Sequence, residues 1–199
     1  IQATFTFAPA AQFEITGCPQ RYCNENNLVR KAYCRLFQKL NEKPIPVRIT
    51  IDSPIPTSRG LGSSSACILG GLCGANALLG EPVSALDLLR LACELEGHPD
   101  NVTPALLGGL KAALVEQDCL LTADFNVSEP LRFAALVPDF ELETHRARQA
   151  LPDAIPPAQA AGALGKLAFL LKGLETADSA LLQAAMNEPL HEPYRIPLI

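Results

Sequence analysis

A glycine-rich stretch between a β-branched segment and a long uncharged run constrains this chain more than any other feature. Residues 54–79 read PIPTSRGLGSSSACILGGLCGANALL and follow the alternating segment Val47–Ile51. This order predicts a strand, a tight turn at Gly60 and Gly62, and a helix that begins near Ser63. Such a turn directs several backbone N–H groups and the positive end of the helix dipole at one point. The stretch therefore predicts a phosphate-binding loop, although a flexible turn capping a buried helix would share the bare glycine spacing.

The full string separates this loop from two other phosphate-binding motifs. No Lys follows the second glycine, as a Walker A loop requires, and Ser65 stands where a dinucleotide-binding GxGxxG has its third glycine. The string instead resembles the P-x-x-x-G-L-G-S-S motif of the GHMP small-molecule kinases. The residues that fill this motif are Pro56, Gly60, Leu61, Gly62, Ser63 and Ser64.

The composition limits the number of domains and the classes of partner. The 199 residues suit one large domain, or one domain with part of another, and 48% hydrophobic residues are ample for a core. A net charge of −5 argues against nucleic acid or an anionic membrane as a partner. The sequence contains no apolar run of membrane-spanning length.

The seven cysteines form no complete metal-binding pattern. Most lie in apolar helical stretches, and we see no signal peptide before them, so we expect reduced thiols in a cytoplasmic protein. Cys18 and Cys23 have the spacing of half a metal site, but no second pair completes it. The sequence therefore does not predict a zinc site.

Hydrophobic periodicity predicts an α+β fold, with strands first and helices later. The first two strands, Ala3–Ala8 and Gln12–Thr16, are expected to form a hairpin. Later strands are predicted at Leu110–Val115, Cys119–Phe125 and Leu131–Val137, the last nearly all apolar and therefore central. The predicted helices are Asn24–Leu40, Ser63–Leu79, Ala85–Glu96, Val102–Leu107, Thr144–Leu151, Pro157–Leu174 and Ser179–Asn187.

The resemblance to GHMP kinases implies a two-domain architecture with a ribosomal-S5-like α+β domain followed by part of a second α+β domain. We expect the nucleotide-binding domain over residues 1–130 and the start of the substrate-side domain over 131–199. The resemblance also implies ATP and Mg²⁺ as cofactors. The nucleotide-binding residues it implies are Asn27, Pro56, Arg59, Gly60, Leu61, Gly62, Ser63, Ser64 and Ser65.

The role of Asn27 has two interpretations. Short polar residues, Asn24 to Asn27, crowd the start of the predicted helix, and such residues cap helices. An amide also offers both a donor and an acceptor, so it could read the edge of a nucleotide base. The Asn-Asn-Leu string is itself a feature of the GHMP kinases.

A magnesium site needs few protein ligands, because Mg²⁺ keeps several of its waters. A hydroxyl at a helix start and a carboxylate at a neighbouring helix end suffice, and Ser64 and Glu96 are the candidates. Glu94 and Glu96 are two residues apart, so only one of them can point into the site. The family pattern favours Glu96, because its metal carboxylate directly precedes a glycine, as Glu96 does. Two solvated acids at a helix end are the structural alternative.

The segment His98-Pro99-Asp100-Asn101 resembles the second GHMP motif in its homoserine-kinase form. In mevalonate-type members this turn ends in an Asp thought to act as a base, whereas an amide such as Asn101 cannot accept a proton. The resemblance therefore implies phosphoryl transfer without a protein base, and this suits a loose transition state. His98, Asp100 and Asn101 are expected to bind the substrate, although His98 could be only a capped turn residue.

Two later segments supply the expected substrate-binding cations. Thr144 and Arg148 are four residues apart and share one helix face, although a solvated basic helix has the same pattern. Their surroundings resemble the homoserine-kinase segment that holds the acceptor and supports the transition state. The string Leu190–Arg195 resembles the family's L-H-x-P-Y-R, in which Arg195 would pair with the substrate carboxylate.

The resemblance covers nearly all of the chain and implies an internal fragment of a kinase for L-homoserine, in a family that is often dimeric. The family's Pro-x-Ser-x-Asn-x-Gly-x-Gly segment would lie before Ile1, and its C-terminal glycine-rich motif after Ile199. We expect residues 1–199 alone to have little or no activity, because part of the substrate pocket lies outside them. The alternatives are a GHMP kinase for another alcohol such as mevalonate, a non-catalytic nucleotide-binding module, and a plain structural domain.

Overall fold

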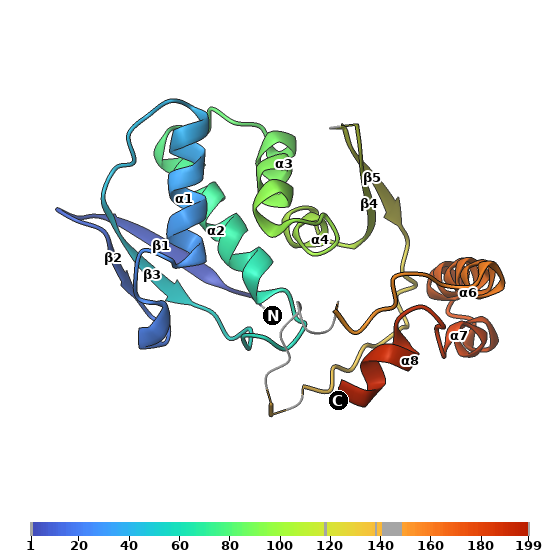
Figure 1. Cartoon of the computed structure of the whole chain (residues 1–199). Coiled ribbons are helices and arrows are strands. Elements are labelled where there is room, and N and C mark those ends of the chain that lie inside the picture. The colour runs from blue at the N-terminus through green and yellow to red at the C-terminus, as the bar shows by residue number, and fades with distance from the viewer. Residues whose placement is uncertain (1, 118, 138, 141–148, 199) are drawn as a thin grey trace. The chain divides into compact units, whose positions relative to one another are not determined.

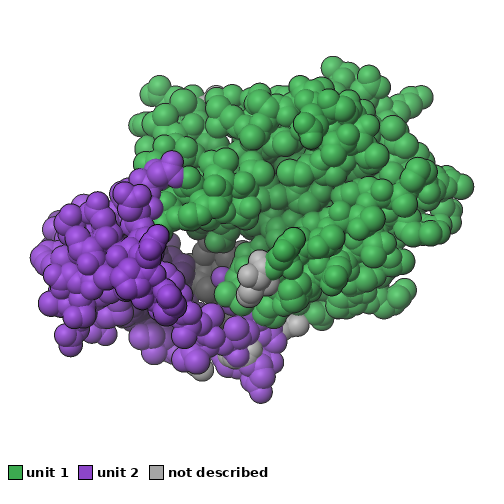
Figure 2. Space-filling view, turned by 180° about the vertical axis from the view of Figure 1, so that it is seen from behind, with its two compact units in different colours: residues 1–57, 61–123 green, residues 58–60, 124–199 purple. Residues whose placement is uncertain are grey.

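The computed structural model of the chain describes residues 2–117, 119–137, 139–140 and 149–198. The chain divides into two compact units, one formed by residues 1–57 and 61–123 and the other by residues 58–60 and 124–199 (Figure 2). We predicted a domain boundary at residues 130 and 131, and the main division by contacts falls between Ala123 and Asp124. In the described part of the chain, no helix has the length and apolar character needed to cross a membrane.

The first unit is built on a three-stranded sheet with the order β1-β3-β2 (Figure 1). The strands are β1 (Thr4–Pro9), β2 (Glu14–Thr16) and β3 (Val47–Asp52). β1 is antiparallel to β3, with Phe7 opposite Ile49, and β2 is parallel to β3, with Ile15 opposite the same residue. The predicted hairpin of β1 and β2 is therefore wrong. β3 separates them, because its buried alternate residues belong at the centre of the sheet.

Helices α1 to α4 belong to the first unit, and the sequence predicted all four. α1 begins later than the predicted Asn24, because Asn27 is its N-cap. α3 has the predicted bounds, and its N-cap is Ser84, whose side chain accepts a hydrogen bond from the backbone N–H of Asp87. The bounds are α1 (Leu28–Lys39), α2 (Ser63–Leu78), α3 (Ala85–Glu96) and α4 (Val102–Leu107).

The core of the first unit lies between α1, α2 and the sheet. α1 buries one apolar stripe, in which the rings of Tyr33 and Phe37 lie 5.0 Å apart. α2 is rich in small and apolar residues and has no polar face. It packs closely against several elements. A Cβ on Gly71 would lie only 2.2 Å from the backbone oxygen of Val29 on α1. The backbones of α1 and α2 are therefore in direct contact at Gly71, with no side chain between them.

The first two of the strands predicted after α4 are also present. β4 (Leu110–Glu116) and β5 (Cys119–Phe125) form a two-stranded sheet of their own. Gln117, at the end of β4, adopts a positive φ of 49°, which suits a tight connection between neighbouring strands.

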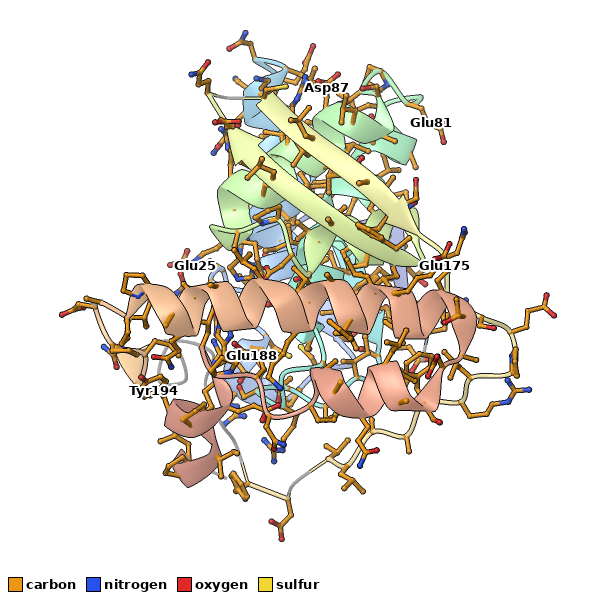
Figure 3. The ribbon with its side chains drawn as sticks, turned by 90° about the vertical axis from the view of Figure 1, so that its right-hand side faces the viewer. Glu25, Glu81, Asp87, Glu175, Glu188 and Tyr194 are labelled. Atoms are coloured by element: carbon orange, nitrogen blue, oxygen red, sulfur yellow. The ribbon has the colours of Figure 1, made fainter. Side chains whose placement is uncertain are left out.

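The second unit contains α6 (Pro157–Thr176), α7 (Ser179–Ala185) and α8 (Glu192–Arg195). α6 and α7 lie side by side (Figure 3), and a Cβ on Gly173 of α6 would lie 3.0 Å from the Leu182 side chain of α7. Lys166 Nζ donates to the backbone oxygen of Ala184, at 3.0 Å. Leu164 and Leu167 of α6 are exposed.

The predicted central strand Leu131–Val137 is not formed. These residues have no regular secondary structure, and Phe133 and Leu136 are 75% and 97% exposed. No described segment pairs with them. An apolar run becomes a central strand only when neighbouring strands bond its backbone and cover its faces. Residues 144–148 of the predicted helix Thr144–Leu151 lie outside the described residues.

The contact of α1 with α2 leads to a prediction about stability. Replacement of Gly71 by Ala should lower the free energy of unfolding by about 1–3 kcal/mol, because the added methyl meets a backbone carbonyl. The matched control is Gly162→Ala on α6, where a Cβ meets nothing within 4 Å. Its helix propensity should make that change neutral or stabilising by up to about 1 kcal/mol. Urea-induced unfolding measures both, and equal effects would contradict the close contact.

Candidate phosphate and cation site

The glycine-rich loop turns through several left-handed residues. Gly60 and Gly62 have φ values of 71° and 74°, and Ser58 has a φ of 55°. A Cβ on either glycine would meet nothing within 4 Å, so backbone conformation rather than crowding requires glycine here. A chain with such alternating conformations can turn successive N–H groups toward one side and form an anion-binding concavity.

The loop leads directly into α2, and Gly62 is the N-cap of that helix. No side chain caps this end, and no acidic residue lies in the first turn. The first-turn N–H groups of a helix have no partners within the helix, and the dipole makes this end positive. The start of α2 therefore has the features of a phosphate site, in agreement with the predicted strand, turn and helix.

A buried carboxylate lies beside the start of α2. Ser64 Oγ donates to Glu96 Oε1 at 2.5 Å, and Ser65 Oγ donates to the same oxygen at 3.1 Å. The Glu96 side chain is only 8% exposed, and Ser65 is fully buried. A carboxylate at such a position needs hydrogen bonds to compensate for lost hydration, and the two hydroxyls provide them. The end of α3 and the start of α2 thus form one polar cluster.

Glu94 points in a different direction. Its carboxylate accepts a hydrogen bond from Arg35 Nη2 on α1, at 3.0 Å, and both side chains are at least one-third exposed. A surface ion pair of this kind contributes little to stability. The structure therefore brings Glu96, and not Glu94, to the loop.

The turn after α3 places three more predicted residues near Glu96. Gly97, with a φ of 85°, ends the helix. Nδ1 of His98 donates to the carboxylate of Asp100, which also accepts the backbone N–H of Asn101 at 3.1 Å. Nε2 of His98 lies 4.0 Å from Glu96 Oε1. Asp100 therefore organises the turn, while Asn101 is exposed at the start of α4.

The hydroxyl of Ser65 has a partner that the sequence did not indicate. Ser65 was predicted only among the nucleotide-binding residues, whereas its hydroxyl is bonded to Glu96. Consecutive helix residues point about 100° apart, so three adjacent serines cannot all face the phosphate. This spacing is the signal from which a separate role for one of them could have been inferred.

Asn27 lies at the start of α1 as a cap. Its Oδ1 accepts the backbone N–H of Val29 at 2.9 Å, and its Nδ2 donates to the backbone oxygen of Tyr22 at 2.9 Å. The side chain is 7% exposed. The capping interpretation is therefore confirmed, and a contact with a nucleotide base stays a prediction.

The remaining charged site residues and Thr144 belong to the second unit or lie outside the described residues. Arg59 Nη2 donates to the backbone oxygen of Asp139 at 2.9 Å. Arg195 is on α8, and its buried Nε has no hydrogen-bond partner in the described part of the chain. Thr144 and Arg148 lie outside the described residues.

The donor set of this cluster restricts the kind of cation it could hold. Among the described residues, no group of three or more His, Cys, Asp and Glu side chains could hold a metal ion. The cluster offers a hydroxyl and one carboxylate, both hard oxygen donors. This set fits Mg²⁺, which binds one or two protein oxygens and keeps its remaining waters.

The sequence is similar to known kinases. Residues 27–109 match the family described as GHMP kinases N terminal domain. Homoserine kinase from Clostridium botulinum (strain ATCC 19397 / Type A) is 43% identical over 183 residues, which is 92% of this chain and 62% of the relative. Homoserine kinase from C. botulinum (strain Alaska E43 / Type E3) is 41% identical over 187 residues, which is 94% of this chain and 63% of the relative.

The fold is also similar to the folds of solved kinase structures. The crystal structure of homoserine kinase from Cytophaga hutchinsonii is 30% identical with a TM-score of 0.78, over 99% of this chain and 65% of that one. Phosphomevalonate kinase from Streptococcus pneumoniae, at 12% identity, has a TM-score of 0.63 over 92% of this chain and 66% of that one, and it shows the fold alone.

Residues 27–109 are thus similar to the N-terminal domain of GHMP kinases, and the fold class is α+β as the sequence predicted. The relatives that it matches over most of its length are homoserine kinases. The chain spans about three-fifths of the length of these curated relatives.

The cap of α1 leads to a second prediction about stability. Asn27→Ala should cost about 1–2 kcal/mol of unfolding free energy, because Val29 N–H and the Tyr22 carbonyl both lose a partner. Asn26→Ala is the matched control, since Asn26 is exposed one residue before the cap. It should change stability by less than about 0.5 kcal/mol. Thermal unfolding compares them, and a neutral Asn27→Ala would refute the cap.

Proposed function

We propose that the protein to which this chain belongs transfers the γ-phosphoryl group of ATP to the hydroxyl of L-homoserine and forms O-phospho-L-homoserine. The observation that carries the proposal is the buried Glu96 carboxylate, which Ser64 and Ser65 hold beside the uncapped start of α2. Similarity to homoserine kinases over 92% of the chain supports the choice of substrate. The proposal includes a role in threonine biosynthesis in the cytoplasm.

The glycine-rich loop would bind the phosphates of ATP. Its left-handed turns and the free first-turn N–H groups of α2 favour negative charge at this point. Pro56, Arg59 and residues 60–65 are the proposed contacts from the loop. Asn27 is proposed at the nucleotide as well, close to the cap that it forms on α1.

Ser64 and Glu96 would hold Mg²⁺ at the phosphates. The cation, when bound, neutralises charge on the phosphate oxygens during transfer. The chain's own contribution is to orient the Glu96 carboxylate at the start of α2, through the two serine hydroxyls. Glu96 also affects the neighbouring thiol of Cys67. Burial, and after it the charge of Glu96, raise the pKa of Cys67 to about 11.

The acceptor side would be formed by His98, Asp100 and Asn101 together with Thr144, Arg148 and Arg195. The bond from His98 to Asp100 and the bond from Asn101 N–H to the same carboxylate fix the shape of this turn. An exposed amide at Asn101 can hold a hydroxyl but cannot take its proton, so the proposal assigns no protein base. Thr144 and Arg148 would support the transition state.

Arg195 is the proposed partner of the substrate carboxylate. Its buried Nε lacks a hydrogen-bond partner among the described residues, which is costly for a guanidinium N–H unless a ligand supplies one. A carboxylate can accept two parallel hydrogen bonds from a guanidinium. An amino-acid substrate would meet this need.

Separate substitutions of Glu94 and Glu96 distinguish a specific role of Glu96 in binding Mg²⁺ from a general effect of removing a negative charge. In the protein at its natural length, Glu96→Gln should lower kcat/KM at fixed Mg²⁺ by about 100-fold or more, because an amide binds Mg²⁺ poorly. Glu94→Gln removes one acid two residues away and leaves the Ser64 contact intact. It should stay within about twofold of the wild type. Equal losses in both variants would refute the assignment.

The two serines should differ in their response to Mg²⁺. Ser64→Ala should abolish most Mg²⁺-dependent turnover, because it removes a proposed ligand. Ser65→Ala should raise the Mg²⁺ concentration for half-maximal rate by roughly 10-fold, because Glu96 loses an orienting bond. Magnesium titrations at saturating ATP measure both effects. An unchanged titration for Ser64→Ala would remove Ser64 from the site.

An acceptor screen tests the proposal itself. The protein at its natural length, with ATP and Mg²⁺, should phosphorylate L-homoserine and leave mevalonate untouched, as a coupled assay of ADP release will show. Turnover of mevalonate alone would favour another GHMP kinase. ATP binding without transfer to any alcohol would favour a non-catalytic nucleotide-binding protein.

A further inference from the structure

Cys18 and Cys23 form a close thiol pair just before α1. Their Sγ atoms are 3.5 Å apart, and both residues are half-buried free cysteines. The Cys23 thiol also lies 3.6 Å from the backbone oxygen of Cys18. The proposed phosphoryl transfer uses neither thiol. The pair is therefore a separate feature of the first unit.

A short turn holds the two cysteines in this position. Residues Gln20–Tyr22 form a 3₁₀ turn, in which Tyr22 N–H donates to the Pro19 oxygen at 2.8 Å. Cys23 N–H continues the turn by donating to the Gln20 oxygen at 3.1 Å. A disulfide requires a sulfur separation of about 2.05 Å, so the sulfurs need to approach by only about 1.5 Å.

The surroundings give the two thiols different reactivities. Burial, together with the neighbouring Cys23 and then Cys67, raises the pKa of Cys18 to about 11. Cys18 therefore keeps its proton at neutral pH. The Asn27 amide donates to its sulfur at 3.9 Å. The Sγ atoms of Cys18 and Cys23 are close enough that, once one sulfur has formed a mixed disulfide, the other is placed to resolve it.

We propose that Cys18 and Cys23 are a modification site, a dithiol that closes to a disulfide by exchange with a low-molecular-weight disulfide. Cys23 thiolate attacks the small disulfide, forms a mixed disulfide and releases one thiol. Cys18 sulfur then attacks Cys23 sulfur and releases the second thiol. The two cysteines lose two electrons and two protons in total, and the small disulfide gains them as two thiols.

Tryptic mapping tests this pairing directly. Trypsin cleaves after Arg21 and Arg30, so Cys18 and Cys23 fall on different peptides that stay together only when a disulfide joins them. The chain is incubated with oxidised glutathione, its remaining thiols are blocked with N-ethylmaleimide, and the digest is analysed by mass spectrometry. We expect peptide 22–30 linked to the peptide that ends at Arg21, and separation of the two by dithiothreitol.

Single substitutions provide the controls. Cys18→Ser and Cys23→Ser should each abolish the linked peptide, whereas Cys34→Ser on α1 should retain it. The exposed Cys119 reports whether the oxidant has acted, because it should carry a mixed disulfide with glutathione. Modified Cys119 without the Cys18–Cys23 link, or a link from Cys18 to Cys67 instead, would overturn the proposal.

Discussion

The close packing of α2 is the constraint on which the candidate site depends. Gly71 meets the backbone of α1 with no room for a side chain, and Gly70 and Gly74 meet the rings of Phe5 and Phe7 from β1. These contacts fix the helix between α1 and the sheet. The glycine-rich loop is continuous with α2. The same contacts therefore fix the direction of the N–H groups in the first turn of α2, which have no partner within the helix. The proposed anion site is thus set by the core rather than by the loop alone.

The buried charge of Glu96 is the second constraint. A carboxylate with so little exposure is stable only with hydrogen bonds or a cation, and two adjacent serine hydroxyls supply the first. Its neighbour Glu94 avoids the same cost by pairing with Arg35 at the surface. One helix end therefore provides both a solvated acid and a buried one, and only the buried acid reaches the phosphate loop.

Local signals in the sequence predicted local structure well. α3 and α4 have the bounds that the sequence predicted, and the glycine-rich loop has the expected strand before it and helix after it. The errors concern which strands are neighbours. The hairpin of β1 and β2 is replaced by pairing of both with β3, and Leu131–Val137 has no partner strand among the described residues. Alternation shows which side of a strand is apolar, but it does not say which strand lies next to it.

The sequence by itself determined the class of chemistry, because the order of Pro56, the loop glycines and the adjacent serines carries the family motif without reference to distant residues. Only the tertiary structure decided how the motif is used. It brought Glu96 to Ser64 across more than thirty residues, turned Glu94 away, and gave the Ser65 hydroxyl a structural partner. The physical reason is that the packing of helices determines which side chains come within hydrogen-bond distance. The spacing of residues along the chain does not specify that packing.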